Sequence, residues 1–291
     1  MRVADNSEVQ ASPKGNESSY RRGTELVRRH RRKTLWRRVG IWSLRLFLAL
    51  VIVLGWEFGS GDPQNEFVLI DEFYVSTPTA IVDRLWRWIA EGVLWHHVWV
   101  TFQETGIGFA IGTTGGLVVG FIVGGNRFIG AVLSPFITAL YSVPRLALIP
   151  LFIIWFGLGM ESKIAMVAIV VFFLVFFNTY SGVTDVDQEL IDVLRVMNAR
   201  SHHIYGKVVL PSAMVWILTG MRVSAPYALV AAVTAEMISS NQGMGFLLIR
   251  SAGQFNIAGV FAAIWVMVAM SLVVNGFVMI LESVFLRWKR V

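Results

Sequence analysis

An all-α membrane protein with six transmembrane helices is the fold class that the sequence predicts, with both termini in the cytoplasm. Hydrophobic residues make up 55% of the 291 residues and charged residues only 15%, and the mean hydropathy is +0.63. The charged residues cluster between apolar runs, and a run of about 20 apolar residues is long enough to cross a hydrocarbon core of roughly 30 Å. Because the chain has no cysteine, disulfides and thiolate metal sites are excluded.

Six apolar runs are predicted to span the membrane, near residues 39–58, 101–123, 128–154, 164–181, 213–238 and 258–282. Eleven of the 25 lysines and arginines precede Val39, and a basic block before the first span places the N-terminus in the cytoplasm. The basic ending RWKRV is placed there by the same rule. Residues 1–38 are therefore predicted to be a basic, disordered cytoplasmic segment, and 39–291 a six-span domain. A cleavable twin-arginine signal is the alternative, but no small-residue cleavage site follows.

Two segments between the spans are predicted to lie on the opposite, outer side. Residues 77–95 carry Ile81, Leu85, Trp88 and Ile89 on one helical face, which predicts an interfacial helix. The sequence SSNQGMGFLLIRSAGQF, between the last two spans, is predicted to be an outer connection. In the third span, Pro144 and Pro150 are expected to disturb the helix, because proline lacks an N–H donor.

A regular series of glycines marks the second span. Gly108, Gly112, Gly116, Gly120 and Gly124 follow one another at intervals of four residues, so they share one helical face. Without Cβ atoms, this face allows another helix to approach closely. We favour packing within the chain over an interface between two copies.

Between the fourth and fifth spans, residues 184–211 read TDVDQELIDVLRVMNARSHHIYGKVVLP. Either Asp185 or Asp187 is suited to cap a helix start, and Asn198 to end the helix in the left-handed conformation. Ser201 is suited to cap a second short helix, and Pro211 to begin the fifth span. The apolar residues of the first helix recur at helical spacing, at Leu190, Val193, Leu194 and Met197. The prediction is a short amphipathic helix on the cytoplasmic side whose apolar face needs a partner.

This loop resembles the EAA loop of ABC-transporter permeases of the binding-protein-dependent importer type. Asp192, Val193 and Leu194 stand at the positions of the family's Glu-Ala-Ala. Asn198 takes the position of the conserved glycine, Ala199 follows it, and Leu210 with Pro211 closes the loop. The two alanines and the glycine are therefore replaced by bulkier residues and by asparagine, and the helix and the turn are kept.

The resemblance covers roughly residues 75–283 and points to the subgroup that imports nitrate, taurine or alkanesulfonates. The stretches VTFQETGIGFAIGTTGGLVVGFIVG, YSVPRLALIPLFIIWFGLGMESKI and KVVLPSAMVWILTGMRVS carry it. It implies the membrane-spanning permease subunit of an ABC importer in the bacterial inner membrane, with the amphipathic helix as the coupling helix. The implied partners are a cytoplasmic ATP-binding subunit, an extracytoplasmic solute-binding protein and a second permease copy, with a homodimer favoured.

Four residues within the apolar runs are candidates for the translocation pathway: Pro144, Arg145, Arg222 and Glu236. An arginine beside a proline break suits a small anionic solute, although packing or a lipid headgroup explains Arg145 and Arg222 equally well. Glu236 is either a pathway residue or a solvated residue at the headgroup level. Glu104 invites the same interpretation, with a structural role favoured by its position near the end of a span.

Several functions lack the residues that they need. The sequence contains no GxxxxGK[ST] phosphate-binding loop and no paired catalytic residues, so an enzyme is not predicted and ATP hydrolysis is assigned to a partner. No cofactor or metal site is expected, because the histidine pairs His96–His97 and His202–His203 lack chelating spacing and suit solvated loops. Nucleic-acid binding is not expected either. The alternatives that remain are a secondary transporter and an ABC permease for a non-anionic solute such as a pyrimidine.

Overall fold

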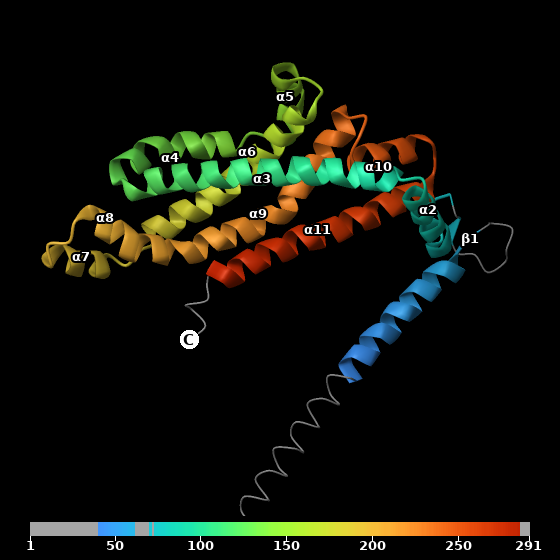
Figure 1. The fold of residues 1–291 in the computed structure, drawn as a ribbon, viewed down its shortest axis with the longest axis horizontal. Helices are drawn as coiled ribbons and strands as arrows, with labels where there is room; N and C mark the ends of the chain where they lie inside the picture. The colour runs from blue at the N-terminus through green and yellow to red at the C-terminus, as the bar shows by residue number, and fades with distance from the viewer. Residues whose placement is uncertain (1–39, 62–69, 72, 286–291) are drawn as a thin grey trace, which may run out of the picture. The chain divides into compact units, whose positions relative to one another are not determined.

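A computed structural model describes residues 40–61, 70–71 and 73–285 (Figure 1). The expected basic segment 1–38 lies outside the described residues. The chain divides into two compact units, residues 1–69 and 70–291. In the first unit, the helix Gly40–Gly59 coincides with the first predicted span and is followed by β1 (Ser60–Gly61). The guanidinium carbon of Arg45 lies 5.2 Å from the ring centroid of Trp42.

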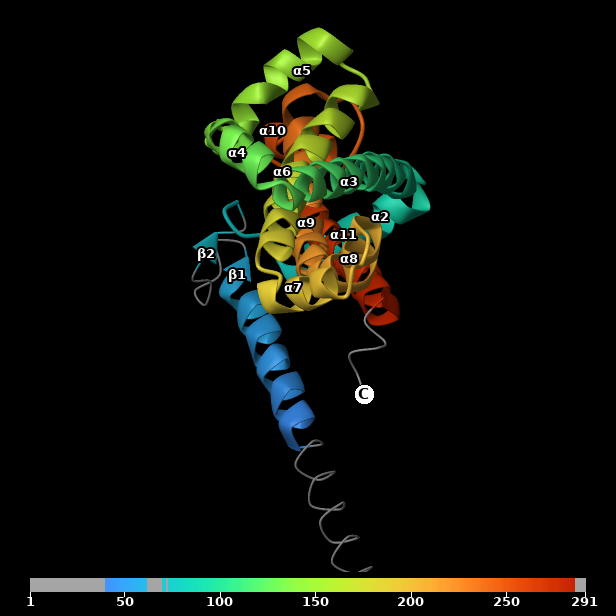
Figure 2. The same ribbon diagram turned by 90° about the vertical axis from the view of Figure 1, so that its left-hand side faces the viewer.

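The second unit is a helical bundle, as predicted. Its long helices α3, α6, α9 and α11 run side by side, α7 and α8 lie at one end, and α10 lies at the other (Figures 1 and 2). We call these the α7 end and the α10 end. The elements are β2 (Ile70–Asp71), α2 (Pro78–Ala90), α3 (Val93–Gly125), α4 (Arg127–Tyr141), η1 (Arg145–Leu148), α5 (Ile149–Phe156), α6 (Met160–Thr184), α7 (Gln188–Val196), α8 (Ser201–Ile204), η2 (Tyr205–Val209), α9 (Leu210–Ser239), α10 (Met244–Gly253) and α11 (Ile257–Phe285).

The described residues contain five helices that are long and apolar enough to cross a membrane, or six if one bent pair counts as a span. The bent pair corresponds to the third predicted span. Its two parts, Arg127–Tyr141 and Arg145–Phe156, meet at an angle of 83°. Pro144 stands at the bend, as predicted, whereas Pro150 lies in the first turn of α5, where no N–H donor is required.

The glycine face of α3 packs against α6. A Cβ atom at Gly108 would lie 2.5 Å from Val167 Cβ, and one at Gly112 would collide with the carbonyl oxygen of Ala168. At Gly120, the added atom would lie 2.7 Å from Thr179 Cβ. The same holds for the remaining two positions, Gly116 and Gly124, which face Phe172 and Val183. The glycine face of α3 is therefore covered by α6, a helix of the same chain.

Two predicted boundaries are wrong, each for a local reason, and one predicted connection contains an additional helix. The interfacial helix stops at Ala90, because Gly92 adopts a positive φ of 73° before α3 begins. The predicted outer connection contains α10, a helix too short to be recognised as a span. The helix that includes α9 starts at Ser201 rather than at Pro211. It passes Pro211 because the π-helical turn η2 lies directly before this proline and leaves its missing N–H without consequence.

Candidate functional site

The predicted cytoplasmic helix is α7, and both of its ends are fixed by local side chains and backbone. Asp187 caps the start, where its Oδ1 accepts a hydrogen bond from the Glu189 N–H at 2.9 Å. The helix ends at Asn198, whose φ is +57°. Two bonds close the turn, from the Asn198 N–H to the Arg195 carbonyl at 2.9 Å and from the Ala199 N–H to the Leu194 carbonyl at 3.0 Å. This is the Schellman arrangement, with asparagine in the place that glycine usually takes.

The helix α7 presents most of its apolar residues to the outside. Leu190 is 52% exposed, Val193 59% and Met197 73%, whereas Ile191 is only 9% exposed. Ile191 packs into a cluster of buried residues from α6 and α9. On the polar side, Asp192 Oδ1 accepts from Arg195 Nη1 at 3.1 Å. Ile191 thus attaches α7 to the bundle, and Leu194 of the predicted apolar face is half-buried. The exposed remainder is the outward face, which we define as Leu190, Val193 and Met197.

The rest of the loop leads from this turn into α9. Ser201 is the first residue of α8 and makes no capping bond, contrary to the prediction; Arg200 precedes the helix. Leu210 donates its N–H to the Tyr205 carbonyl, which is the wide bond of a π-helical turn, and Pro211 follows. The Tyr205 hydroxyl donates to the Gly125 carbonyl at 2.8 Å, so this turn is tied to the end of α3.

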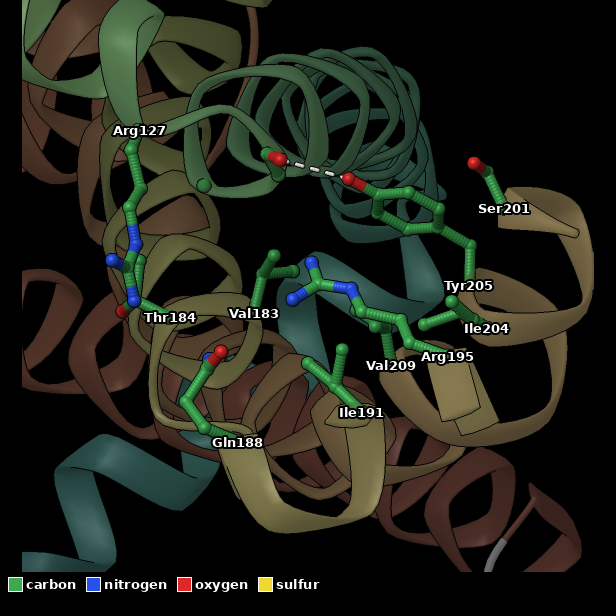
Figure 3. A pocket seen from close by; sticks show the side chains of 12 residues that line it. Arg127, Val183, Thr184, Gln188, Ile191, Arg195, Ser201, Ile204, Tyr205 and Val209 are labelled. Atoms are coloured by element: carbon green, nitrogen blue, oxygen red, sulfur yellow. Dashed lines mark hydrogen bonds between the residues drawn. The ribbon is translucent and has the colours of Figure 1, made fainter. Parts of the chain in front are cut away.

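A cavity of about 480 Å³ lies between this loop and the turn that joins α3 to α4 (Figure 3). Figure 3 shows the side chains of Arg127 and Arg195 directed toward it, with the Tyr205–Gly125 bond on its wall. Asn126 shapes the turn, because its Oδ1 accepts from the N–H groups of Phe128 and Ile129 at 2.9 and 3.2 Å. Nothing in the sequence pattern indicates this cavity, since its two arginines are 68 residues apart.

A second cavity, of about 420 Å³, lies at the bend of the third predicted span. Pro144 and Arg145 line it together with Met166 of α6 and Tyr227 of α9. The guanidinium carbon of Arg145 lies 4.3 Å from the ring centroid of Tyr141, a cation–π distance. Within the described part of the chain, Arg145 makes no ion pair and its Nε atom is buried without a hydrogen-bond partner.

The other predicted pathway arginine is already paired. Arg222 Nη2 lies 2.8 Å from Glu282 Oε2, which joins α9 to α11. The side chain of Arg222 is 48% exposed and that of Glu282 is 22% exposed. The structure therefore brings Pro144 and Arg145 together at one cavity and places Arg222 elsewhere.

Glu236 is buried inside the protein at the α10 end and is not solvated. Glu236 and Glu104 are each 1% exposed, and they interact with each other. Glu236 Oε1 accepts from the Thr101 hydroxyl at 2.6 Å, and its Oε2 accepts from the Gly245 N–H at 2.7 Å. Gly243, with a φ of +99°, makes room for this carboxylate, since a Cβ atom there would collide with it. Glu236 thereby fixes α3 and the start of α10 to α9.

Lys163 completes this buried cluster, and it was not among the predicted site residues. Lys163 is 1% exposed and interacts electrostatically with both Glu104 and Glu236. Its Nζ donates to the carbonyls of Leu158, Gly159 and Ser239 at 2.6, 3.0 and 2.8 Å. A lysine within an apolar run was the available signal. We call Glu104, Lys163 and Glu236 the buried charged cluster.

The interpretation of the first histidine pair as solvated loop residues is wrong. Both residues lie in α3, His97 is 8% exposed, and its Nδ1 accepts from the Gly243 N–H at 2.9 Å. His202 and His203 are exposed, and they lie in α8. No group of three or more metal-binding side chains was found among the residues that the structure describes.

Comparison with known proteins gives a consistent result. The sequence model of the family described as "binding-protein-dependent transport system inner membrane component" matches residues 112–290. An aliphatic sulfonates transport permease protein of Bacillus subtilis is 34% identical over 85% of this chain and 88% of its own length. The formylaminopyrimidine transport permease protein of Halalkalibacterium halodurans is 26% identical over 84% of this chain and 95% of its own length.

The fold is also similar to solved structures. A chain of the MetNI methionine ABC transporter in an inward-facing conformation aligns with 67% of this chain and 98% of its own length, at a TM-score of 0.59 and 16% identity. The resemblance inferred from the loop and from the flanking motifs is thus confirmed. The protein is a multi-pass inner-membrane permease of an ABC importer, and it belongs to the binding-protein-dependent transport system inner membrane component family.

Proposed function

We propose that this permease conducts a small anionic solute and receives its energy at α7 from a separate cytoplasmic ATPase subunit. The observation that carries the coupling role is the outward face of α7, because three apolar side chains are exposed on a helix with well-formed ends. An exposed apolar helix face favours a protein partner. The positive-inside rule places the basic N-terminus in the cytoplasm. Four spans precede α7 when the bent pair is counted as one, so α7 returns to the cytoplasmic side.

The other partners follow from the same family. An extracytoplasmic solute-binding protein would deliver the solute at the α10 end. A second copy of the chain would complete the pathway, because the cavity at Arg145 has exposed rim residues, Leu146 and Tyr227, at 55% and 53% exposure. Residues 1–38 and 39–291 remain the proposed cytoplasmic segment and transmembrane domain.

Co-purification from native membranes tests the coupling role. The tagged full-length chain is expected to retain an ATPase with a phosphate-binding loop, identified by mass spectrometry. Val193→Asp places a charge on the outward face and is expected to reduce the retained ATPase at least tenfold, because burying an unpaired carboxylate is costly. Val193→Ile keeps the face apolar and serves as the matched control.

The thermal unfolding temperature of the isolated chain is measured in parallel. It should be unchanged in both variants, since Val193 is exposed in the chain alone. If Val193→Asp retains the ATPase and supports transport as the unsubstituted chain does, α7 is not the coupling helix.

Arg145 supports the anionic solute. A guanidinium group without a carboxylate partner, in a cavity formed by two membrane-spanning elements, is suited to bind a sulfonate or a similar anion. The B. subtilis relative, whose name refers to aliphatic sulfonates, supports the same class. The relative named for formylaminopyrimidine represents the non-anionic alternative. Since Arg222 and Glu236 have partners within the chain, we assign them structural roles in this conformation.

Uptake by cells that encode this chain decides between the solutes. After deletion of the chain, uptake of labelled taurine, ethanesulfonate, nitrate, bicarbonate and formylaminopyrimidine is measured. Loss of uptake of one of the anions is expected, and Arg145→Gln should reproduce it whereas Arg145→Lys retains part of it. Loss of formylaminopyrimidine uptake alone would contradict the anionic class while leaving the coupling role intact.

A further inference from the structure

We propose that the cavity behind α7 binds the phosphate group of an anionic phospholipid of the inner leaflet. The proposal rests on the cytoplasmic position of the α7 end in the proposed function. Two guanidinium groups, those of Arg127 and Arg195, are directed toward this cavity from different elements (Figure 3). A phosphate oxygen pair is the group that a guanidinium binds best, through two parallel hydrogen bonds.

The charges around the cavity favour an anion. No aspartate or glutamate is among the residues that line it. Arg195 bonds Asp192 through Nη1, which leaves its other N–H donors free for a ligand, and both of these side chains are 65% exposed. Arg127 makes no ion pair within the described part of the chain. Two like charges that face one cavity repel each other, and an anion between them removes this repulsion.

The shape of the neighbouring surface favours a lipid over a free anion. A groove of about 430 Å³ adjoins the cavity behind α7 and shares Gly124, Arg127 and Thr184 with it. It extends along α4, where Ala131 and Pro135 form part of its wall, and reaches Tyr180 of α6. If the bent pair counts as a span, the groove along α4 would lead from the cavity into the membrane in the proposed topology. A headgroup phosphate between the arginines and a glycerol or acyl segment along α4 would occupy the cavity and the groove.

The position of the site gives the lipid an effect on coupling. The walls of the cavity come from α7, from the segment that follows it, and from the α3–α4 turn. The Tyr205 hydroxyl, in the segment after α7, already bonds the Gly125 carbonyl at that turn. A lipid phosphate bound to Arg195 of α7 and Arg127 of α4 adds a second connection between the same parts. Basic pockets between transmembrane helices on the cytoplasmic side are suited to anionic headgroups.

Lipid retention by the purified full-length chain tests the proposal. The chain is exchanged in detergent into phosphatidylglycerol, phosphatidylcholine or inorganic phosphate, and bound species are counted by native mass spectrometry. Phosphatidylglycerol is expected to remain bound to the unsubstituted chain. Arg127→Gln is expected to weaken its binding about tenfold, the effect of losing charge-assisted hydrogen bonds, and Arg127→Gln with Arg195→Gln to abolish it. Arg250→Gln removes an exposed arginine of α10 and serves as the matched control.

A second variant separates the two sources of phosphate. Ala131→Trp fills the groove along α4 without changing a charge, so it should displace phosphatidylglycerol and leave binding of inorganic phosphate unchanged. Retention of inorganic phosphate with no retention of lipid would overturn the lipid site in favour of a soluble anion. Equal retention of phosphatidylglycerol and phosphatidylcholine, or full retention by the double arginine variant, would overturn the phosphate site altogether. None of these outcomes depends on the ATPase, so the coupling role is tested separately.

Discussion

The α10 end of the bundle buries a lysine and two glutamates, whereas the α7 end exposes a leucine, a valine and a methionine. Each arrangement is unfavourable in isolation, because charges are stabilised by water and apolar surface by its removal from water. At the α10 end, the charges have partners inside the chain: Lys163 bonds three carbonyls, and Glu236 bonds Thr101 and Gly245. At the α7 end, the described residues bury Ile191 of α7 but leave Leu190, Val193 and Met197 exposed.

This difference distinguishes contacts that hold the fold together from a surface that binds another molecule. A charged cluster with internal partners holds helices together and does not need a ligand. An apolar face without internal partners is complete only when another molecule covers it. Buried charges at the α10 end therefore predict large losses of stability on substitution, whereas the outward face of α7 predicts losses of association with little change in stability.

Lys163→Met is expected to have the largest effect on the chain. It removes the Lys163 donor from three carbonyl groups and the cation from two buried carboxyl groups, which costs about 3–5 kcal/mol. The measurement is the free energy of unfolding in detergent. Lys207→Met, at an exposed position of η2, should change it by less than about 0.5 kcal/mol. A change in the free energy of unfolding below about 0.5 kcal/mol for Lys163→Met would show that the buried charged cluster does not hold the helices together.

The two glutamates of the cluster are expected to differ. Glu236→Gln loses one of two accepting oxygens and leaves a buried donor unsatisfied, so it should destabilise the chain by about 1–3 kcal/mol. Glu104→Gln replaces one of two buried carboxyl groups that face a single lysine, and its amide can donate to Glu236. It should leave stability unchanged or raise it, and the reverse order in thermal unfolding would contradict the assigned contacts.

At the α7 end, substitution in the turn after the helix is expected to have a smaller effect on stability. Asn198→Ala forces alanine into a left-handed conformation and should destabilise this turn by about 1 kcal/mol, whereas Asn198→Gly should not. Hydrogen exchange of the α7 amides is the suitable measurement, since the effect is local. Equal exchange rates in both variants would show that the backbone does not need a positive φ at this position.

The smallest effect on stability is expected on the outward face. Met197→Ser removes an apolar side chain that is 73% exposed, so the free energy of unfolding should change by less than about 0.5 kcal/mol. Association with the ATPase should nevertheless weaken severalfold. A large loss of stability would mean that the isolated chain already covers this face, and the contrast between the two ends would fail.

Much of the fold could be predicted, because the decisive properties are local. The long apolar runs predicted the spans near 101–123, 164–181, 213–238 and 258–282, which lie within α3, α6, α9 and α11. The cap at Asp187 and the turn at Asn198 depend on neighbouring backbone groups and were predictable as well. The third span was only partly predictable, because Pro144 indicates a break but not an angle.

The sequence by itself determined that this chain lies in a membrane, where its spans are, and that the polar segment 184–211 forms an amphipathic helix and a turn. Hydropathy and backbone preference are properties of short segments, so no distant contact was needed. Only the tertiary structure decided that Glu104, Lys163 and Glu236 share one buried cluster, and that Arg127 and Arg195 share one cavity. Whether a charge is paired, solvated or available depends on helix packing, which joins residues far apart in the chain.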